Sequence, residues 1–226
     1  MPPATLSKRA PVTTFDPITL ALALAFMALV PTIAVVSTTF LKLAVVLSLV
    51  RNALGVQQIP PNLALYGLAF ILSVYIMAPV GQRMYEEVRT VPEAMRSVDG
   101  ILSAAQRGAE PMRGFLFKHS TPEHRRFFVD TAQSLWGPEL SAGVTEKDFL
   151  VLLPSFMVSE LTTAFQIGFL LFLPFVIIDI IISNILLAMG MMMVSPVMIS
   201  MPLKLFLFVM IDGWSRLIRG LVLTYT

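Results

Sequence analysis

The stretch that decides the fold runs from Phe165 to Trp214 and reads FQIGFLLFLPFVIIDIIISNILLAMGMMMVSPVMISMPLKLFLFVMIDGW. It is apolar enough to enter a bilayer, yet it carries Asp179, Lys204 and Asp212. A charge at the bilayer centre costs at least ~2.5–3.5 kcal/mol, so charges that remain there usually face protein or water and have a partner. Its prolines remove backbone donors and free carbonyls that neighbouring protein or water must satisfy. The segment is therefore expected to belong to an assembly with a polar or water-filled interior.

The composition indicates a membrane-associated chain with one polar insert. Of the 226 residues, 56% are hydrophobic and 13% are charged, whereas a soluble domain has about 25% charged residues. Between residues 83 and 148 lie 9 Lys or Arg and 10 Asp or Glu, most of the charge of the chain. A net charge of +2 without a basic cluster argues against nucleic acid as a partner. The absence of cysteine excludes disulfides and thiolate metal sites.

Four segments follow from this distribution. Residues 1–17 are expected to form a flexible tail, 18–82 N-terminal apolar helices, 83–149 the polar helical insert, and 150–226 a C-terminal apolar hairpin. No sustained alternation of apolar and polar residues predicts a strand, so we expect an all-α fold of membrane-associated bent helical hairpins.

Individual apolar runs give more detailed expectations. Ile18–Leu41 is long enough to span a bilayer and should be kinked at Pro31, and Leu63–Val80 should be stopped by Pro79 and Gly81. The next two runs, Leu161–Ile178 and Ile180–Leu203, are separated only by Asp179, and Leu205–Thr226 is predicted to be one amphipathic helix.

Capping signals place helices in the insert. Thr121 is suited to be an N-cap, with Pro122 at the first helical position, and Gly137-Pro138 should end that helix. Thr145 and Asp148 are spaced like a capping box before the next apolar run.

The charges Asp179 and Lys204 predict a hairpin. One straight helix would hold these residues, 25 positions apart, at ~37 Å. Their midpoint falls in Met191–Met193, so a chain folded there brings the two charges side by side. Gly190, Pro196 and Pro202 are the expected breaks. The alternative is that each charge contacts water or a neighbouring subunit.

Other charges have less definite expectations. Asp212 and Arg216 are spaced i, i+4 and could pair within a helix. Glu160 is a candidate partner of Lys42 or Arg51, all three being possible assembly charges. The favoured interpretation is that Glu160 marks a helix N-terminus, where the helix dipole stabilises a carboxylate.

Enzyme signals are missing. His119 and His124 are the only histidines, and no HExxH, Walker loop or nucleophile elbow occurs. An aspartyl dyad of Asp179 and Asp212 is disfavoured because each has a candidate basic partner. We expect no catalytic residue, metal or cofactor.

Several blocks resemble the SctR/FliP family, inner-membrane proteins of type III secretion export apparatus. In chain order these blocks are Arg51–Asn62, Met77–Val80, Pro154 with Ser159–Leu161, Ala164–Phe169, Ile178–Asp179, Ala188–Met193 and Phe208–Trp214. The resemblance implies a pentamer that assembles with SctS-, SctT- and SctU-type subunits into a ring or helical pore for unfolded secreted polypeptides. It also implies that Met191, Met192 and Met193 form a methionine gate, although methionines in an apolar run more often fill a core.

The resemblance also bears on topology and on rival functions. The positive-inside rule gives conflicting predictions for the orientation of the chain in the membrane. The resemblance implies that the insert lies on the periplasmic side of the bacterial inner membrane. Its bent hairpins are held largely above the membrane plane, in contact with lipid. Gly55-Val56-Gln57-Gln58 favours the injectisome branch over a flagellar paralogue. A small-solute or ion channel or transporter, with Asp179 and Lys204 as a relay, and a purely structural scaffold are the rivals.

Overall fold

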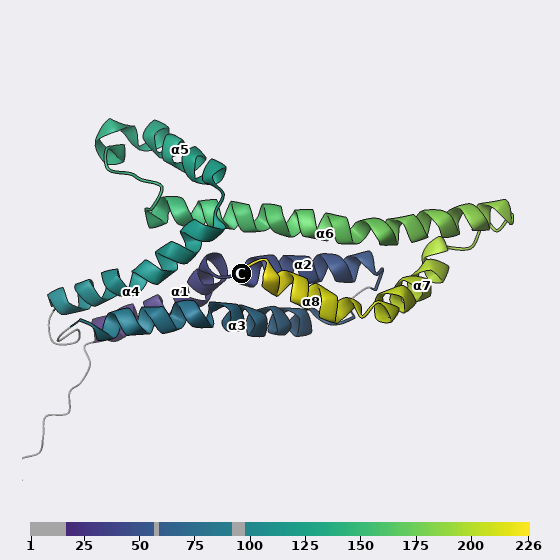
Figure 1. Ribbon diagram of the computed structural model, residues 1–226, viewed down its shortest axis with the longest axis horizontal. Coiled ribbons are helices and arrows are strands. Elements are labelled where there is room, and N and C mark those ends of the chain that lie inside the picture. Colours follow the sequence, from purple (N-terminus) through teal and green to yellow (C-terminus); the bar gives the residue numbers. More distant parts are fainter. Residues whose placement is uncertain (1–16, 57–58, 92–97) are drawn as a thin grey trace, which may run out of the picture. The chain divides into compact units, whose positions relative to one another are not determined.

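The structure is a computed structural model that describes residues 17–56, 59–91 and 98–226. Within these ranges it is all-α, as predicted, with eight helices and no strand (Figure 1). The helices are α1 (Pro17–Ser37), α2 (Phe40–Ala53), α3 (Asn62–Arg89), α4 (Val98–His119), α5 (Pro122–Ser141), α6 (Phe149–Ala188), α7 (Pro196–Met210) and α8 (Gly213–Leu223). The expected tail, residues 1–17, lies outside the described ranges except for Pro17.

The chain divides into two units, residues 1–34 and 35–226. The first unit consists, in its described part, of α1, which continues through Pro31. The expected run Ile18–Leu41 is not one helix, because the chain leaves helical geometry between Ser37 and Phe40. There Phe40 N donates to the Thr38 hydroxyl at 3.4 Å, and short hydroxyl side chains that bond nearby backbone groups compete with helix continuation.

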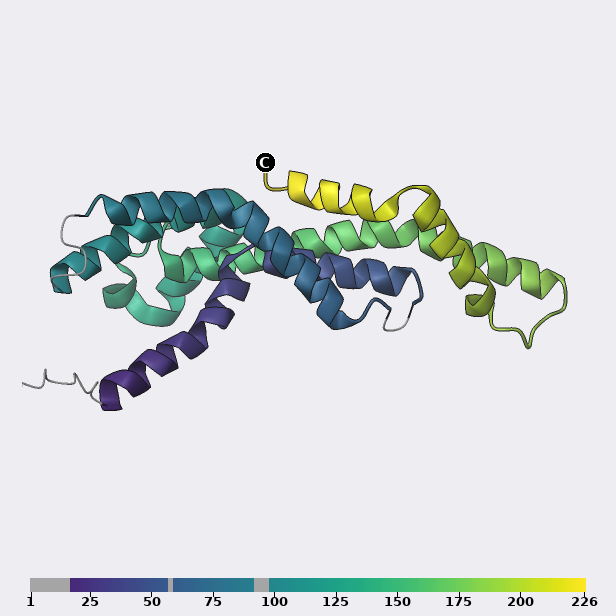
Figure 2. The same ribbon diagram turned by 90° about the horizontal axis from the view of Figure 1, so that it is seen from below.

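Helix α2 is the centre of the second unit and packs against α6 and α3 (Figures 1 and 2). Leu43, Val46 and Leu47, which share one face of α2, are completely buried. The contact with α6 is close at Gly168, where a Cβ atom would lie 2.3 Å from Leu49 Cδ1. A glycine in the Ala164–Phe169 block therefore lets the two helices approach.

Helices α3 and α4 lie side by side. The prediction that Pro79 and Gly81 stop the third helix was wrong, because α3 continues through both to Arg89. An apolar helix tolerates such residues where neighbouring helices, side chains or water satisfy the freed backbone groups. The polar stretch expected at 83–149 thus begins inside α3 and ends where α6 begins.

The insert follows its capping signals. Thr121 caps α5, with its hydroxyl accepting from His124 N, and Gly137 breaks the helix at φ +77° before a last turn to Ser141. The Asp148 carboxylate accepts from Thr145 N at 2.7 Å. The expected capping box is nevertheless not formed, because α6 begins at Phe149 with Asp148 itself as the N-cap, and the contact closes a turn before the helix.

Helix α6 has 40 residues and is ~60 Å long. Of the described helices, α3 and α6 are each long and apolar enough to cross a membrane by length and composition. Met27–Ser37 with Phe40–Ala53, and α7 with α8, are bent pairs that could each act as one further span.

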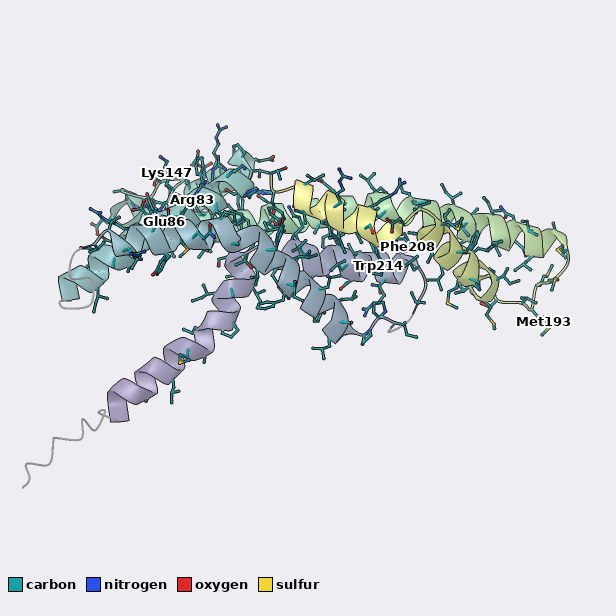
Figure 3. The ribbon with its side chains drawn as sticks, turned by 60° about the horizontal axis from the view of Figure 1, so that its bottom comes forward. Arg83, Glu86, Lys147, Met193, Phe208 and Trp214 are labelled. Atoms are coloured by element: carbon teal, nitrogen blue, oxygen red, sulfur yellow. The ribbon has the colours of Figure 1, made fainter. Side chains whose placement is uncertain are left out.

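The expected single helix Leu205–Thr226 is broken. Helices α7 and α8 meet at 63°, and the corner residue Asp212 has the left-handed backbone φ 54°, ψ 49°. Phe208 of α7 packs edge-to-face on Trp214 of α8, with ring centroids 5.3 Å apart (Figure 3). This aromatic contact closes the corner.

Candidate functional site

The hairpin of α6 and α7 has its tip at residues 189–195, where the sequence predicted it. Gly190 ends α6 at φ +74°, with Met191 N bonded to Leu186 O and Gly190 N to Leu187 O. This is a Schellman ending, which needs a left-handed residue that glycine adopts without strain. Pro196 stands in the first turn of α7, where its missing N–H is not needed. Two of the three expected breaks therefore bound the tip.

The third expected break was wrong. Pro202 lies inside α7, which runs uninterrupted from Pro196 to Met210. Because α7 is strongly apolar and packs along α6, the lost backbone bond does not end the helix.

The methionines Met191, Met192 and Met193 occupy the tip and point away from the rest of the chain. Their exposed fractions rise from 40% to 81% and 100% along the run. Met193 lies at the far end of the hairpin (Figure 3). Met192 and Met193 are largely uncovered by their own chain and Met191 is partly so, and none of the three fills the core of this subunit.

Asp179 and Lys204 meet across the hairpin as the midpoint predicted. Lys204 Nζ lies 2.6 Å from Asp179 Oδ2. The lysine side chain is 6% exposed and the aspartate side chain 37% exposed, so the pair is buried on one side only. The alternative, in which each charge contacts only water or a neighbouring subunit, is excluded for this contact.

Two further groups complete the contact, and sequence reasoning missed both. Ser200 Oγ donates to Asp179 Oδ1 at 2.6 Å, and Lys204 Nζ donates to Ala53 O at 3.4 Å. Ser200 and Lys204 are one helical turn apart on α7, which could have suggested that they share a partner. Ala53 is the last residue of α2, where free carbonyls carry negative partial charge. Lys204 thus links α7 to α6 and to the end of α2.

The expected pair of Asp212 and Arg216 does not form in the described part of the chain. Asp212 Oδ1 accepts instead from Ser215 Oγ at 2.9 Å. The i, i+4 rule holds within a helix, whereas Asp212 is the left-handed residue that precedes α8.

A second charged cluster is formed by Lys42, Glu160 and Tyr225 in the interior. Lys42 Nζ lies 3.1 Å from Glu160 Oε1, and both side chains are 3% exposed. The Tyr225 hydroxyl donates to Glu160 Oε2, and Lys42 Nζ lies 3.7 Å from the centroid of the Tyr225 ring. Burial and the neighbouring Glu160 carboxylate raise the pKa of Tyr225 well above its usual range, so the hydroxyl stays protonated and donates.

This cluster corrects the favoured interpretation of Glu160. The residue lies inside α6, which begins at Phe149, and so it does not mark a helix N-terminus. Lys42 was one of the two alternative partners considered. Because the pair is enclosed by its own chain, Lys42 and Glu160 are not free assembly charges.

Arg51 serves the turn that follows α2. Its Nη1 atom donates to Pro60 O at 3.2 Å and to Asn62 Oδ1 at 2.5 Å. The residue therefore holds the start of α3 against the end of α2, within the block that resembles the family signature, and does not pair with Glu160.

A serine–histidine contact fastens the insert to α6. Ser159 Oγ lies 2.8 Å from His124 Nδ1, accepts from Thr121 N at 2.9 Å and donates to Ser155 O at 2.7 Å. Since the one hydroxyl proton is directed at Ser155 O, His124 donates to Ser159 and does not activate it as a nucleophile. Within the described ranges, no three His, Asp or Glu side chains are grouped to hold a metal ion.

Comparison with known proteins identifies the family. The model described as "FliP family" matches residues 23–221. The chain is 50% identical over 210 residues to "Yop proteins translocation protein R" of Yersinia pestis, covering 93% of this chain and 97% of that protein. It is 51% identical over 209 residues to "Probable translocation protein y4yL" of Sinorhizobium fredii, covering 92% of each. It is 42% identical over 211 residues to "Harpin secretion protein HrcR" of Erwinia amylovora, covering 93% of this chain and 97% of that one. The chain belongs to the FliP family.

Proposed function

We propose that this protein is an export-gate subunit of a type III secretion apparatus in the bacterial inner membrane. The observation that carries the proposal is the α6–α7 hairpin, which presents Met191, Met192 and Met193 at a tip that its own chain leaves uncovered. The relatives named for Yop translocation and for harpin secretion support the assignment and favour the injectisome over the flagellar branch.

The gate works by packing and exclusion of water, without chemistry in this subunit. Several copies bring their tips around one axis, and the unbranched, deformable methionine side chains fill the opening. An apolar constriction of this kind blocks water and ions by dewetting. Because methionine adapts to varied shapes, the same ring closes around a passing unfolded polypeptide.

The Asp179–Lys204 contact gives the tip its support. It lies ~12–14 Å behind the tip along each helix and ties α6 and α7 to the end of α2. The tip therefore moves with the body of the subunit instead of swinging freely.

The assembly covers the apolar surface that the single chain leaves open. The second half of α6 and all of α7 carry many exposed large apolar side chains, among them Phe172, Ile177, Ile181, Val197, Phe206 and Val209. In the proposed apparatus other copies, in a pentamer, and SctS-, SctT- and SctU-type subunits cover this surface, and lipid contacts the rest. The polar insert faces the periplasm, and the bent helices are held largely above the membrane plane.

Alanine substitution at the tip tests the gate. Replacing Met191, Met192 and Met193 together by alanine should open the constriction and raise the resting ion conductance of membranes that contain the assembled complex. The control replaces three exposed methionines elsewhere, Met27, Met198 and Met210, and removes the same three thioether groups. Conductance that stays at the wild-type level in the tip variant, or rises equally in the control, would contradict the gate.

A further inference from the structure

A cavity of about 500 Å³ lies between α3, α4 and the C-terminal residues, away from the hairpin. Its basic lining residues are Arg83 of α3 and Lys118 and His119 of α4. Its apolar lining includes Val80, Phe115 and the Tyr225 ring. The volume falls in the ~300–1,000 Å³ range of small-molecule sites.

The basic side chains that line this cavity have no acidic partner within its lining. No carboxylate is among the described residues that line it. Neither Arg83 nor Lys118 forms an ion pair within the described ranges, and Lys118 Nζ makes one long hydrogen bond, 3.4 Å, to Thr226 O. Both side chains are exposed to solvent.

His119 lies within this cavity lining beside the cations. Its ring packs on Phe115 at 4.7 Å and on Tyr225 at 5.2 Å between centroids. Burial is the main cause that lowers the pKa of His119 to about 4, and the positive charges of Lys118 and Lys42 lower it further. The Glu160 carboxylate, which accepts from the Tyr225 hydroxyl, is already engaged by Lys42.

The cavity lies at the end of the apolar part of α3, whose residues Ile76, Pro79 and Val80 line it together with Arg83. Arg83 follows the apolar stretch of that helix, which is long and apolar enough to cross a membrane. About two to three turns before Arg83, Ile71, Val74 and Tyr75 are exposed by 66%, 55% and 71%. A molecule bound here would meet cations at one end and an apolar helix face along its length.

We infer that this cavity binds the headgroup of an anionic phospholipid, with its phosphate at Arg83 and Lys118 and its acyl chains along α3. Basic pockets between helices at a membrane boundary recognise anionic headgroups in this way. The apolar wall distinguishes a lipid from free phosphate, which would gain nothing from Val80 and Phe115.

Native mass spectrometry of the full-length chain, released from nanodiscs of phosphatidylglycerol or phosphatidylcholine, tests the inference. The wild type should retain phosphatidylglycerol in preference to phosphatidylcholine. Each cation near an anionic lipid contributes about fivefold, so R83Q/K118Q should retain phosphatidylglycerol about 25-fold more weakly. The matched control R126Q/K147Q removes two exposed positive charges from the insert and should bind like the wild type.

A second measurement uses the unaltered protein and stands even if the double variant misfolds. In phosphatidylglycerol nanodiscs the imidazole of His119 should titrate at a higher pH than in phosphatidylcholine, as seen by NMR of labelled histidine. Equal retention of both lipids, an equal loss in R126Q/K147Q, or the same His119 titration in both nanodiscs overturns the inference. The same His119 titration in both nanodiscs is the result expected if the cavity holds an acidic segment of a partner subunit and not a lipid. These outcomes do not depend on the export gate, because none of them measures secretion or conductance.

Discussion

The two halves of α6 are built for different surroundings. The first twenty residues contain eight buried positions, from Val151 to Gly168, whereas the last twenty contain two, Phe175 and Leu186. The first half packs into its own chain and encloses the pair of Lys42 and Glu160. The second half is more apolar than the first but faces outward and ends at the methionine tip. One helix thus joins a self-contained core to a surface that requires other molecules.

The ion pair of the first half is more deeply buried than the ion pair of the second half. Lys42 and Glu160 are almost fully withdrawn from water, whereas the side chain of Asp179 is 37% exposed. Removing one partner should therefore cost more in the first half than in the second, and the following predictions test that order.

The largest expected effect on stability is that of Lys42→Met. It leaves the Glu160 carboxylate buried with only the Tyr225 hydroxyl, and an uncompensated buried charge costs about 3–5 kcal/mol. The midpoint of thermal or denaturant unfolding of the purified full chain measures this loss. The double variant K42M/E160M should recover most of it, because apolar replacement of a whole buried pair is close to neutral. Lys147→Met, at an exposed site, is the control. An equal loss of stability there would show that burial of Lys42 is not the cause of the effect.

A smaller loss is expected for Asp179→Asn. A hydrogen bond to a charged group contributes up to about 3 kcal/mol, and exposure to water reduces this to about 1–2 kcal/mol. Asp212→Asn, whose carboxylate bonds only Ser215 among the described residues, should change the unfolding midpoint little.

Single charge reversal at 179 or 204 should reduce assembly, and D179K/K204D should restore it in part. Full rescue is not expected, because a carboxylate at position 204 would face the Ala53 carbonyl; no rescue at all would contradict the pair.

A further effect is a pH dependence from His119 of α4, a helix that packs against α6. Its folded-state pKa of about 4 lies below the ordinary 6.5, so the unfolded chain binds the proton more readily. The stability that this group contributes is complete above pH 6.5 and is lost as the pH falls from 6.5 to 4. Unfolding midpoints of the wild type should decline more across this window than those of His119→Phe. Parallel curves would show that His119 is not held neutral.

The hairpin pair was predictable from the sequence because its geometry is local. Asp179 and Lys204 stand symmetrically about a glycine-bounded tip, and a single fold of the chain brings them together. The Lys42–Glu160 contact links residues 118 positions apart, and no periodicity connects them. The third member, Tyr225, comes from a third segment, so only tertiary packing discloses the cluster.

The failed predictions share a physical cause. Pro79 and Pro202 were expected to end helices, and Asp212 was expected to lie within one. Tertiary packing decided all three: neighbouring helices let the chain continue through the prolines, while the aromatic corner of Phe208 and Trp214 forces a left-handed residue at Asp212. Local propensity predicted the helices themselves but not where each of them stops.

Site-specific photo-crosslinking from position 193 in the assembled apparatus, with an exported polypeptide stalled in transit, tests the central claim most directly. A photoreactive amino acid replaces Met193, and position 27 on α1 carries the control probe. Crosslinks from position 193 to the stalled polypeptide, and between copies of this chain when no polypeptide is present, are the predicted result. Crosslinks from position 193 only to lipid or only within its own chain would show that the tip lies away from the export path.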